Sequence, residues 1–288
     1  MKTGLAIWHY PHRTPIENAR YFSKELDSVS MLGYHFIDIC RDEVQSKELS
    51  EALKEHNPVF TVHHKLPLSH SEKDVATYME DLRLAREWQR KYGALAIYSF
   101  DVPQSIRDNI YPYLEAAMKT FEGTDTKIAI EDFGLTEAEL QQLEPLKGNA
   151  QFGFLLDAGH LFIRLNGKYD GGATLFWYSE MECPGRKFDT APAKEDFLYA
   201  LKNKPFPVCE MHLHNNDGAH DIHLFLHNIE EFVPEGYMDI AMYAEVLREV
   251  GYDGVLTIES APGMCFKCAG QDADDGIAKT IAYWKNLQ

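Results

Sequence analysis

The chain has 288 residues, of which 45% are hydrophobic and 25% are charged, and its formal net charge is −17 at pH 7. This length is sufficient to bury one large core, and the composition is typical of a soluble globular protein. The acidic balance argues against nucleic acid as a partner, because proteins that bind phosphate backbones usually present a basic surface. Anionic membrane surfaces are disfavoured for the same reason, and no apolar run is long enough to span a bilayer.

The cysteines and the amino terminus predict a cytoplasmic protein. Five cysteines occur at irregular spacing: Cys40, Cys183, Cys209, Cys265 and Cys268. An odd, irregular set in a long chain is typical of a reducing compartment rather than of a disulfide framework. The first residues show no basic segment followed by an apolar signal region, and they already resemble a strand.

Strand-like apolar runs alternate with helical patterns along the chain. The predicted strands are residues 4–10, 34–40, 58–64, 93–100, 127–132, 152–157, 207–214 and 254–259. The predicted helices are residues 15–32, 44–56, 72–92, 104–122, 137–147, 194–203, 239–250 and 272–287. Eight such β and α units predict an α/β fold, a single-domain (β/α)8 TIM barrel over residues 1–288. An open doubly wound sheet is less favoured, because no glycine-rich phosphate turn follows the first strand.

Local signals support several of these boundaries. Three predicted helix starts carry a hydroxyl cap with an acid three residues later: Thr14 with Glu17, Ser71 with Asp74, and Thr136 with Glu139. Three glycines follow predicted helices, where left-handed C-terminal caps are common: Gly33, Gly93 and Gly251. Two long connections, residues 158–193 and 215–238, leave the carboxyl ends of strands. Barrel enzymes have their active sites there, so both connections are candidate lids.

The densest run of metal-binding residue types lies between residues 208 and 224, which read VCEMHLHNNDGAHDIHL. In a strand, Glu210, His212 and His214 share one face, because alternate side chains point to opposite sides. Asp221 and His223 follow in loop-like sequence. Imidazole and carboxylate groups at this density are the usual ligands of divalent transition metals.

Four other predicted strands carry an ionisable residue near their carboxyl ends, on the face opposite their large apolar residues. These residues are His63, Glu131, Asp157 and Glu259. Together with the histidines of the seventh strand, they would point into the same mouth of the barrel. Carboxylates gathered there would repel one another unless they were protonated or bridged by a cation. The pattern therefore predicts a metal ion in the mouth.

In their order and spacing, several motifs resemble the xylose-isomerase-like TIM barrel superfamily, and the resemblance covers nearly the whole chain. The motifs are Thr61-Val62-His63, Ile130-Glu131-Asp132, Leu156-Asp157-Ala158-Gly159-His160, His212-Leu213-His214, Asp221-Ile222-His223 and Thr257-Ile258-Glu259. That superfamily includes sugar and sugar-phosphate isomerases, ketose 3-epimerases and endonuclease IV.

The resemblance to the ketose 3-epimerase branch implies one divalent metal ion, which would be Mn, Co, Mg or Zn. Its ligands would be Glu131, Asp157, Glu259 and one of His212 and His214. Glu131 and Glu259 would also be the catalytic residues that move protons. The implied activity is a metal-dependent isomerase or epimerase acting on a carbohydrate or polyol derivative through an enediolate, although a hydride shift stays open. Relatives are often dimers or tetramers, so a homo-oligomer is compatible with this expectation.

The alternative is a metal-dependent hydrolase or lyase, including a phosphodiesterase that resembles the three-zinc endonuclease IV. That pattern would recruit His63, His160, Asp221 and His223 as ligands, whereas the isomerase pattern leaves them as substrate contacts or supports of the ligands. Two departures weaken the alternative. The fourth strand has no histidine at its end, and no short Gly-x-Gly turn follows His223. A barrel that binds a sugar without converting it is a third possibility.

Overall fold

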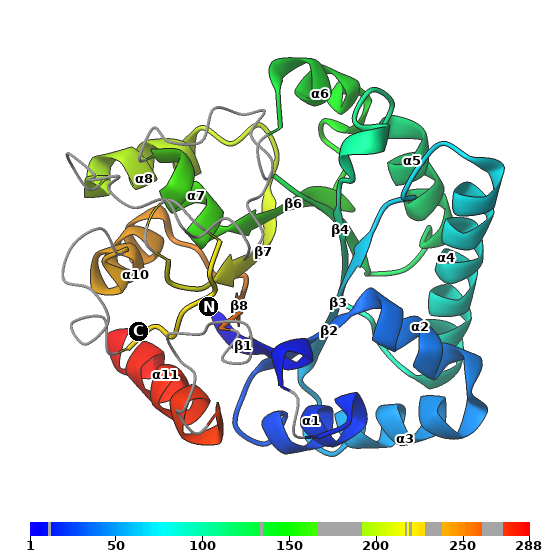
Figure 1. Cartoon of the computed structure of the whole chain (residues 1–288), viewed down its shortest axis with the longest axis horizontal. Coiled ribbons are helices and arrows are strands. Elements are labelled where there is room, and N and C mark those ends of the chain that lie inside the picture. Colours follow the sequence, from blue (N-terminus) through cyan, green and yellow to red (C-terminus); the bar gives the residue numbers. More distant parts are fainter. Residues whose placement is uncertain are drawn as a thin grey trace.

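The computed structural model describes residues 1–10, 13–132, 135–165, 192–216, 218, 221–227, 238–260 and 273–288. Most of the two predicted lids, and Cys183, Cys265 and Cys268, lie outside these ranges. In the described part, eight parallel strands close into a barrel in chain order, with helices around it (Figure 1). The predicted TIM barrel is therefore confirmed. No helix among the described residues is long and apolar enough to cross a membrane.

Each strand pairs in parallel with the next, and β8 closes on β1. The strands are β1 (Lys2–Ala6), β2 (Ser28–Leu32), β3 (Val59–Lys65), β4 (Ile97–Asp101), β5 (Lys127–Glu131), β6 (Phe152–Asp157), β7 (Val208–Leu213) and β8 (Val255–Ile258). The α-helices are α1 (Pro15–Phe22), α2 (Gly33–Arg41), α3 (Glu43–Lys54), α4 (Glu72–Tyr92), α5 (Tyr111–Thr120), α6 (Glu137–Gln142), α7 (Ala158–Leu165), α8 (Lys194–Lys202), α10 (Ile240–Val250) and α11 (Ala273–Leu287). Short 3-10 helices are η1 (Ile7–His9), η2 (Gln104–Ile106) and η3 (Glu144–Leu146).

The second strand was predicted at the wrong place. Residues 34–40 lie in α2, and the predicted helix 15–32 divides instead into α1 and β2. The apolar residues of 34–40 fit a buried helix face as well as a strand, and Phe36 and Ile39 are buried there. In β2 only Val29 and Met31 face the helices, while small serines alternate with them toward the barrel interior. Such a strand has a weak apolar signal.

The predicted helix starts are largely confirmed. Thr14 and Thr136 form complete capping boxes with the acid three residues later. The Ser71 hydroxyl accepts a hydrogen bond from the backbone N–H of Asp74 at 3.2 Å. The Asp74 carboxylate accepts instead from Ser69 Oγ at 2.5 Å. The capping box at α4 is therefore incomplete, and only the Ser71 hydroxyl caps the helix. The predicted helix 104–122 begins with η2 and becomes α-helical at Tyr111.

Of the three glycines predicted as left-handed caps, one is confirmed. Gly251 ends α10 with a φ of 68°. Gly93 has extended backbone with a φ of 166°, so that prediction is wrong. The prediction for Gly33 is also wrong, because Gly33 begins α2. A Cβ at Gly33 would lie 2.2 Å from Cγ of His64, so this position needs glycine for close packing rather than for a left-handed turn.

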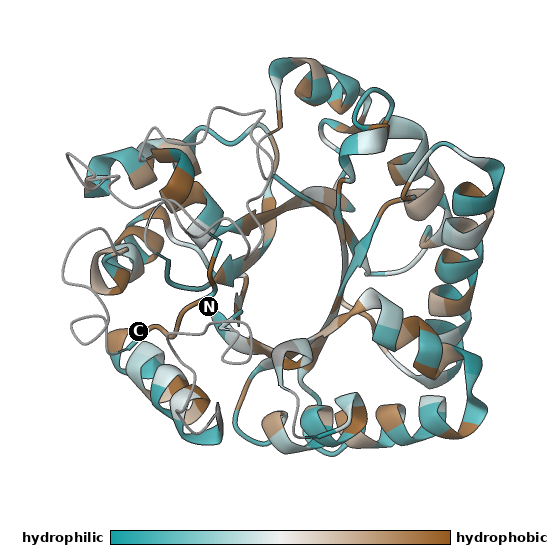
Figure 2. Ribbon diagram, viewed as in Figure 1, coloured by the Kyte–Doolittle hydropathy of each residue, from teal (hydrophilic) through white to brown (hydrophobic). Residues whose placement is uncertain are grey.

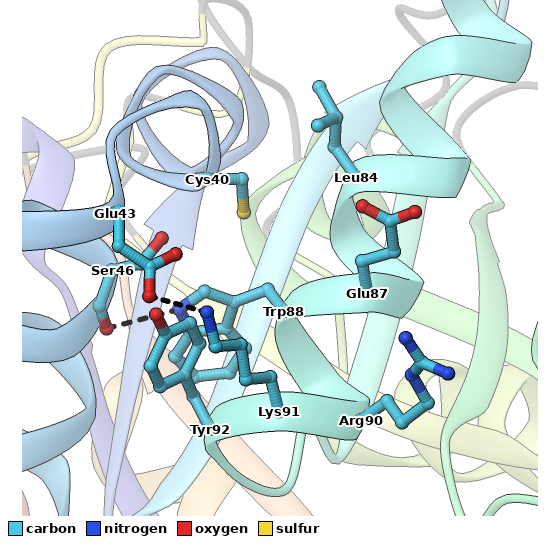
Figure 3. Close-up of a pocket in the computed structure, with 9 residues that line it drawn as sticks. All are labelled: Cys40, Glu43, Ser46, Leu84, Glu87, Trp88, Arg90, Lys91 and Tyr92. Carbon is cyan, nitrogen blue, oxygen red and sulfur yellow. Dashed lines mark hydrogen bonds and ion pairs between the residues drawn. The ribbon is translucent and has the colours of Figure 1, made fainter.

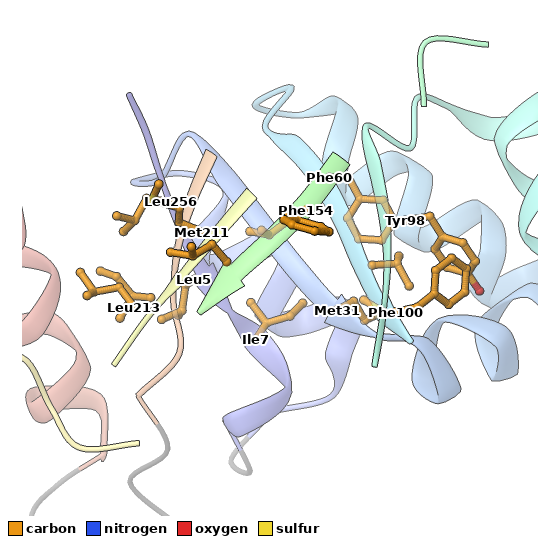
Figure 4. Close-up of a cluster of buried hydrophobic side chains, with 14 of the residues drawn as sticks. Leu5, Ile7, Met31, Phe60, Tyr98, Phe100, Phe154, Met211, Leu213 and Leu256 are labelled. Atoms are coloured by element: carbon orange, nitrogen blue, oxygen red, sulfur yellow. The ribbon is translucent and has the colours of Figure 1, made fainter. Parts of the chain in front are cut away.

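The main hydrophobic core lies between the outward faces of the strands and the surrounding helices. Figure 4 shows part of it, including Leu5, Phe60, Tyr98 and Met211, which come from four different strands. Hydrophilic and hydrophobic residues alternate along the outer helices, as expected for helices with one buried face (Figure 2).

A separate small cluster lies on the inward faces of the strands, inside the barrel. Its buried members are Ile97, Ala129, Leu155 and Val255. Ile97 begins β4 and is in register with Thr61, whereas Val255 begins β8 and is in register with Glu210. The cluster therefore fills the barrel toward the amino ends of the strands, and the carboxyl ends are left for polar side chains.

Candidate metal centre

At the carboxyl ends of the strands, the structure gathers all the ionisable residues that the sequence pointed to, and one more. They form four groups among the described residues, three of which share Asp157 or His214, and the members of each are close enough to share a metal ion. The groups are Asp157, His212 and Glu259; Asp157, His160 and His214; His214, Asp221 and His223; and His63, Asp101 and Glu131. In each group the candidate ligand atoms lie within 4.8 Å of one another.

The first group lies where three neighbouring strand ends meet. Asp157 ends β6, His212 is in β7, and Glu259 directly follows β8. His212 Nδ1 is 2.9 Å from Glu259 Oε2. The backbone N–H of His160, in the first turn of α7, donates to Asp157 Oδ1 at 2.8 Å. All three ligand side chains are buried, so the barrel itself fixes this group.

His214 belongs to a neighbouring group on the other side of Asp157. His214 Nε2 is 3.2 Å from Asp157 Oδ1 and 3.4 Å from Asp221 Oδ1. The ring of His223 stacks on that of His214 at 3.9 Å, and His223 Nε2 is 2.9 Å from Asp221 Oδ1. His223 has a left-handed backbone with a φ of 45°, which is uncommon for a non-glycine residue and often accompanies functional sites.

A glycine makes this arrangement possible. Gly159 lies in α7, directly against the imidazole of His214. A Cβ at this position would be 2.3 Å from His214 Cε1, which no real contact tolerates. The Asp157-Ala158-Gly159-His160 motif therefore provides a carboxylate, space for His214, and a second imidazole within four residues.

The group of His63, Asp101 and Glu131 includes one residue, Asp101, that was not predicted from the sequence. His63 Nε2 is 3.0 Å from Asp101 Oδ1 and 3.7 Å from Glu131 Oε2. Ser99 Oγ is 3.0 Å from His63 Nδ1, and this contact directs the opposite ring nitrogen toward the two carboxylates. The predicted fourth strand stopped at residue 100, whereas β4 continues to Asp101 on the inward face. Because side chains two residues apart in a strand share a face, the inward position of Ser99 predicts that Asp101 also points inward.

His160 connects these groups into one network. Its Nδ1 is 2.8 Å from Glu131 Oε1, and its Nε2 is 3.2 Å from Asp221 Oδ2. Glu131 is not in the groups that contain Asp157 or Glu259, and the predicted set of four ligands around one ion stays a prediction. The two histidines of the His212-Leu213-His214 motif are also separated: one faces Glu259 and the other Asp221.

Burial and neighbouring charges shift the proton affinities of this network. Burial raises the pKa of Glu131 to about 7, although the adjacent His160 opposes that shift. Burial acts to lower the pKa of His223, but the negative charge of Asp221 outweighs it and raises that pKa to about 10. The pKa of Asp157 is lowered: burial would raise it, but His160 and His214 outweigh that effect. The shifts of Asp157 and His223 favour their charged forms, whereas that of Glu131 favours its neutral form.

The network fits a divalent metal ion because several of its buried donor atoms make no hydrogen bond among the described residues. Asp157 Oδ2, His214 Nε2 and Asp221 Oδ1 are buried and make no hydrogen bond within the described part of the chain. Several of them lie close to an opposite charge without hydrogen-bond geometry, which indicates that their lone pairs converge on a common space. Imidazole nitrogen and carboxylate oxygen together suit Mn, Co or Zn.

The candidate metal-binding groups are distinct from a hollow of about 540 Å³ on the outside of the barrel. That hollow lies between α2, α3 and the carboxyl-terminal half of α4 (Figure 3). Its lining includes Cys40, Trp88 and the ion pair of Glu43 with Lys91, and none of the residues of the mouth. The Trp88 indole N–H donates to the backbone carbonyl of Ser46 at 3.4 Å, so this wall is part of the helix packing.

Comparison with known proteins assigns the family. Residues 26–287 match the sequence profile of the family described as xylose isomerase-like TIM barrel. The chain belongs to this family. A stretch of 72 residues is also 33% identical to an uncharacterized protein of Methanocaldococcus jannaschii, and it covers 25% of this chain and 22% of that protein.

Solved structures of low sequence identity share the fold of this family member. D-Psicose 3-epimerase from Clostridium cellulolyticum is 12% identical with a TM-score of 0.60, covering 100% of this chain and 99% of that one. The probable 3-DHS dehydratase AsbF of Bacillus anthracis is 15% identical with a TM-score of 0.63, covering 100% of both chains. A sugar phosphate isomerase/epimerase from Parabacteroides distasonis is 11% identical with a TM-score of 0.61, covering 98% of this chain and 93% of that one. At these identities the likeness concerns the fold alone.

Proposed function

We propose that this family member is a divalent-metal-dependent isomerase or epimerase that acts on a carbohydrate or polyol derivative. The observation that carries the proposal is the buried group of Asp157, His212 and Glu259, with Glu131 on a neighbouring strand end of the same mouth. Structural neighbours described as D-psicose 3-epimerase and L-ribulose 3-epimerase support it as a fold-level analogy.

Asp157, His212 and Glu259 would hold the ion, and His214 would approach it from the other side of Asp157. The ion would supply Lewis-acid polarisation of a substrate carbonyl, which acidifies the adjacent C–H bond. The ring of Trp8, in η1, lies 6.0 Å from that of His63 and 5.9 Å from that of His212. Trp8 would give the carbon skeleton of a sugar an apolar wall beside the ion.

The two glutamates would move protons. Glu131 has its carboxylate fixed between His160 at 2.8 Å and His63 at 3.7 Å, so it would take a proton from the substrate at a defined position. Glu259 is fixed by His212 at 2.9 Å and would return a proton from its own side of the mouth. Two carboxyl groups on separate strands would allow removal and return at different faces or at neighbouring carbons through an enediolate.

The test is to incubate the metal-loaded protein with a panel of ketoses, aldoses and polyol derivatives in D₂O. Deuterium incorporation by NMR reports proton transfer with the solvent. E131Q and E259Q are each expected to lower turnover by about 10²–10⁴-fold. E48Q, on the exposed face of α3, is the matched control and should behave as the wild type. Near-normal turnover by E131Q or E259Q on a true substrate would refute the assigned role.

A second candidate, a metal-dependent hydrolase of the endonuclease IV type, is favoured by two of the other three groups. His63, Asp101 and Glu131 form one, and His214, Asp221 and His223 form the other. Asp101 stands at the end of the strand where the sequence lacks the histidine expected of that type. The net charge of −17 argues against a nucleic acid substrate. Cleavage of an abasic-site duplex with excess zinc would establish this function, and no cleavage under those conditions would count against it.

A further inference from the structure

A carboxyl group lies in the barrel core just inside the proposed metal centre. Glu210 is in β7, two residues before His212, and is completely buried. Its inward direction follows from the register, because Leu155 and Val255 of the neighbouring strands pair with it inside the barrel. Thr61 Oγ1 and Thr257 Oγ1 both donate to Glu210 Oε1, at 3.0 Å and 2.7 Å. Hydroxyl groups from two strands, β3 and β8, thus hold one carboxyl oxygen of a residue in β7.

The charge of this group has one nearby partner. His212 Nε2 is 3.8 Å from Glu210 Oε1, within ion-pair distance. No lysine or arginine among the described residues forms an ion pair with Glu210. Glu210 Oε2 and His212 Nε2 are both buried without a hydrogen bond in the described ranges. A buried carboxylate is costly unless it is paired, so its placement beneath this imidazole calls for a reason beyond packing.

The two edges of the His212 ring face different carboxyl groups. Nδ1 is 2.9 Å from Glu259 Oε2 in the metal-binding group, and Nε2 faces Glu210 below it. We propose that Glu210 is a positioning residue, whose carboxylate faces the Nε2–H edge of His212 at ion-pair distance and so directs the Nδ1 lone pair at the metal ion. A carboxylate behind a ligating histidine fixes its tautomer and its ring orientation and increases its basicity. This inference rests on the proposed function, because it assumes that His212 binds the ion.

The first test measures Zn²⁺ affinity of the full chain by titration calorimetry. E210Q keeps the shape of the side chain and an oxygen for the threonines but removes the negative charge. We expect it to weaken Zn²⁺ binding about 10–100-fold. S30A is the matched control, because Ser30 is a buried inward hydroxyl of β2 with no hydrogen bond among the described residues. S30A should bind Zn²⁺ as the wild type does. Equal affinity of E210Q and the wild type would overturn the proposal.

The second test uses the wild type, so it does not depend on whether a variant at position 210 folds. Long-range ¹H–¹⁵N correlation spectra of the Zn²⁺-loaded wild type report the tautomer of each histidine, with His212 assigned by its loss in H212N. We expect the proton of His212 on Nε2, and a proton on Nδ1 would overturn the proposal. A wild type that binds no Zn²⁺ would refute the proposed function and this inference with it. A wild type that binds, with an unchanged E210Q, would refute the inference alone.

Discussion

The two ends of the barrel interior are built from the same strand faces but have opposite chemistry. Toward the amino ends, Ile97, Leu155 and Val255 belong to a buried apolar cluster. Two residues further along the same faces, Leu155 is followed by Asp157 and Val255 by Thr257, and the mouth beyond them is filled with carboxylates and imidazoles. A TIM barrel thus separates stability from function along the length of each strand.

This comparison gives a simple expectation for substitutions. A change at the apolar end should alter the free energy of unfolding and leave metal binding intact. A change at the mouth should alter metal binding and turnover more than stability. A substitution at one end that changed the quantity assigned to the other end would contradict this separation.

The largest effect on stability is expected for L155A. Leu155 is fully buried in the interior cluster, and deletion of its side chain leaves a cavity. Denaturant unfolding should show a loss of about 2–5 kcal/mol. The Zn²⁺ affinity measured below the unfolding transition should equal that of the wild type. L68A, at an exposed leucine, is the control for stability. A large loss of affinity in L155A would show that the two ends are not separable.

G159A is expected to lower both the free energy of unfolding and the affinity for metal. The added Cβ would overlap the imidazole of His214, and overpacking of this kind costs about 1–3 kcal/mol. Because His214 must move, metal affinity should also fall. G93A is the matched control, since Gly93 has extended backbone and a Cβ there would meet no atom within 4 Å. If G159A kept wild-type affinity, His214 would have no part in the metal site.

D101N distinguishes support of Glu131 from a second metal ion. Asp101 holds His63, which in turn contacts Glu131 Oε2. In the isomerase account the variant should lose about 10–100-fold in turnover while the number of ions per chain stays the same. Elemental analysis beside a turnover assay checks both points. A loss of one ion per chain would instead support the hydrolase.

The smallest effect is expected for T136A, at the start of α6 and outside the four groups of the mouth. It removes the Thr136 hydroxyl that accepts from the Glu139 N–H at the start of α6. Loss of such a cap costs about 1 kcal/mol, which denaturant unfolding can resolve. Metal affinity and turnover should not change. A clear loss of either would mean that α6 positions the mouth, contrary to the separation described here.

Much of this architecture was accessible from the sequence because strands and helices have different periods. Two-residue alternation placed His63, Glu131 and Asp157 on the inward face, and the structure has them there. The method failed at β2, where Ser28 and Ser30 provide the inward face and only two large residues remain as an apolar signal. Inward positions of a barrel tolerate small residues wherever the interior is already filled.

The pairing of side chains within the mouth could not be predicted in this way. Alternation shows that His212 and His214 share a face, but it contains no information on which carboxylate each one meets. That depends on the stagger between β6, β7 and β8 and on the path of the chain at Asp221 and His223. Strand alternation likewise contains no information on the contact of Glu131 with His160, which lies in α7.

The central claim is that the mouth of this barrel holds a divalent metal ion. Elemental mass spectrometry of protein purified without added metal or chelator tests it most directly. The account predicts about one ion of Mn, Co, Mg or Zn per chain. Two or three zinc ions per chain would move the assignment to the hydrolase. No bound metal, even after soaking with each of these ions, would contradict the claim.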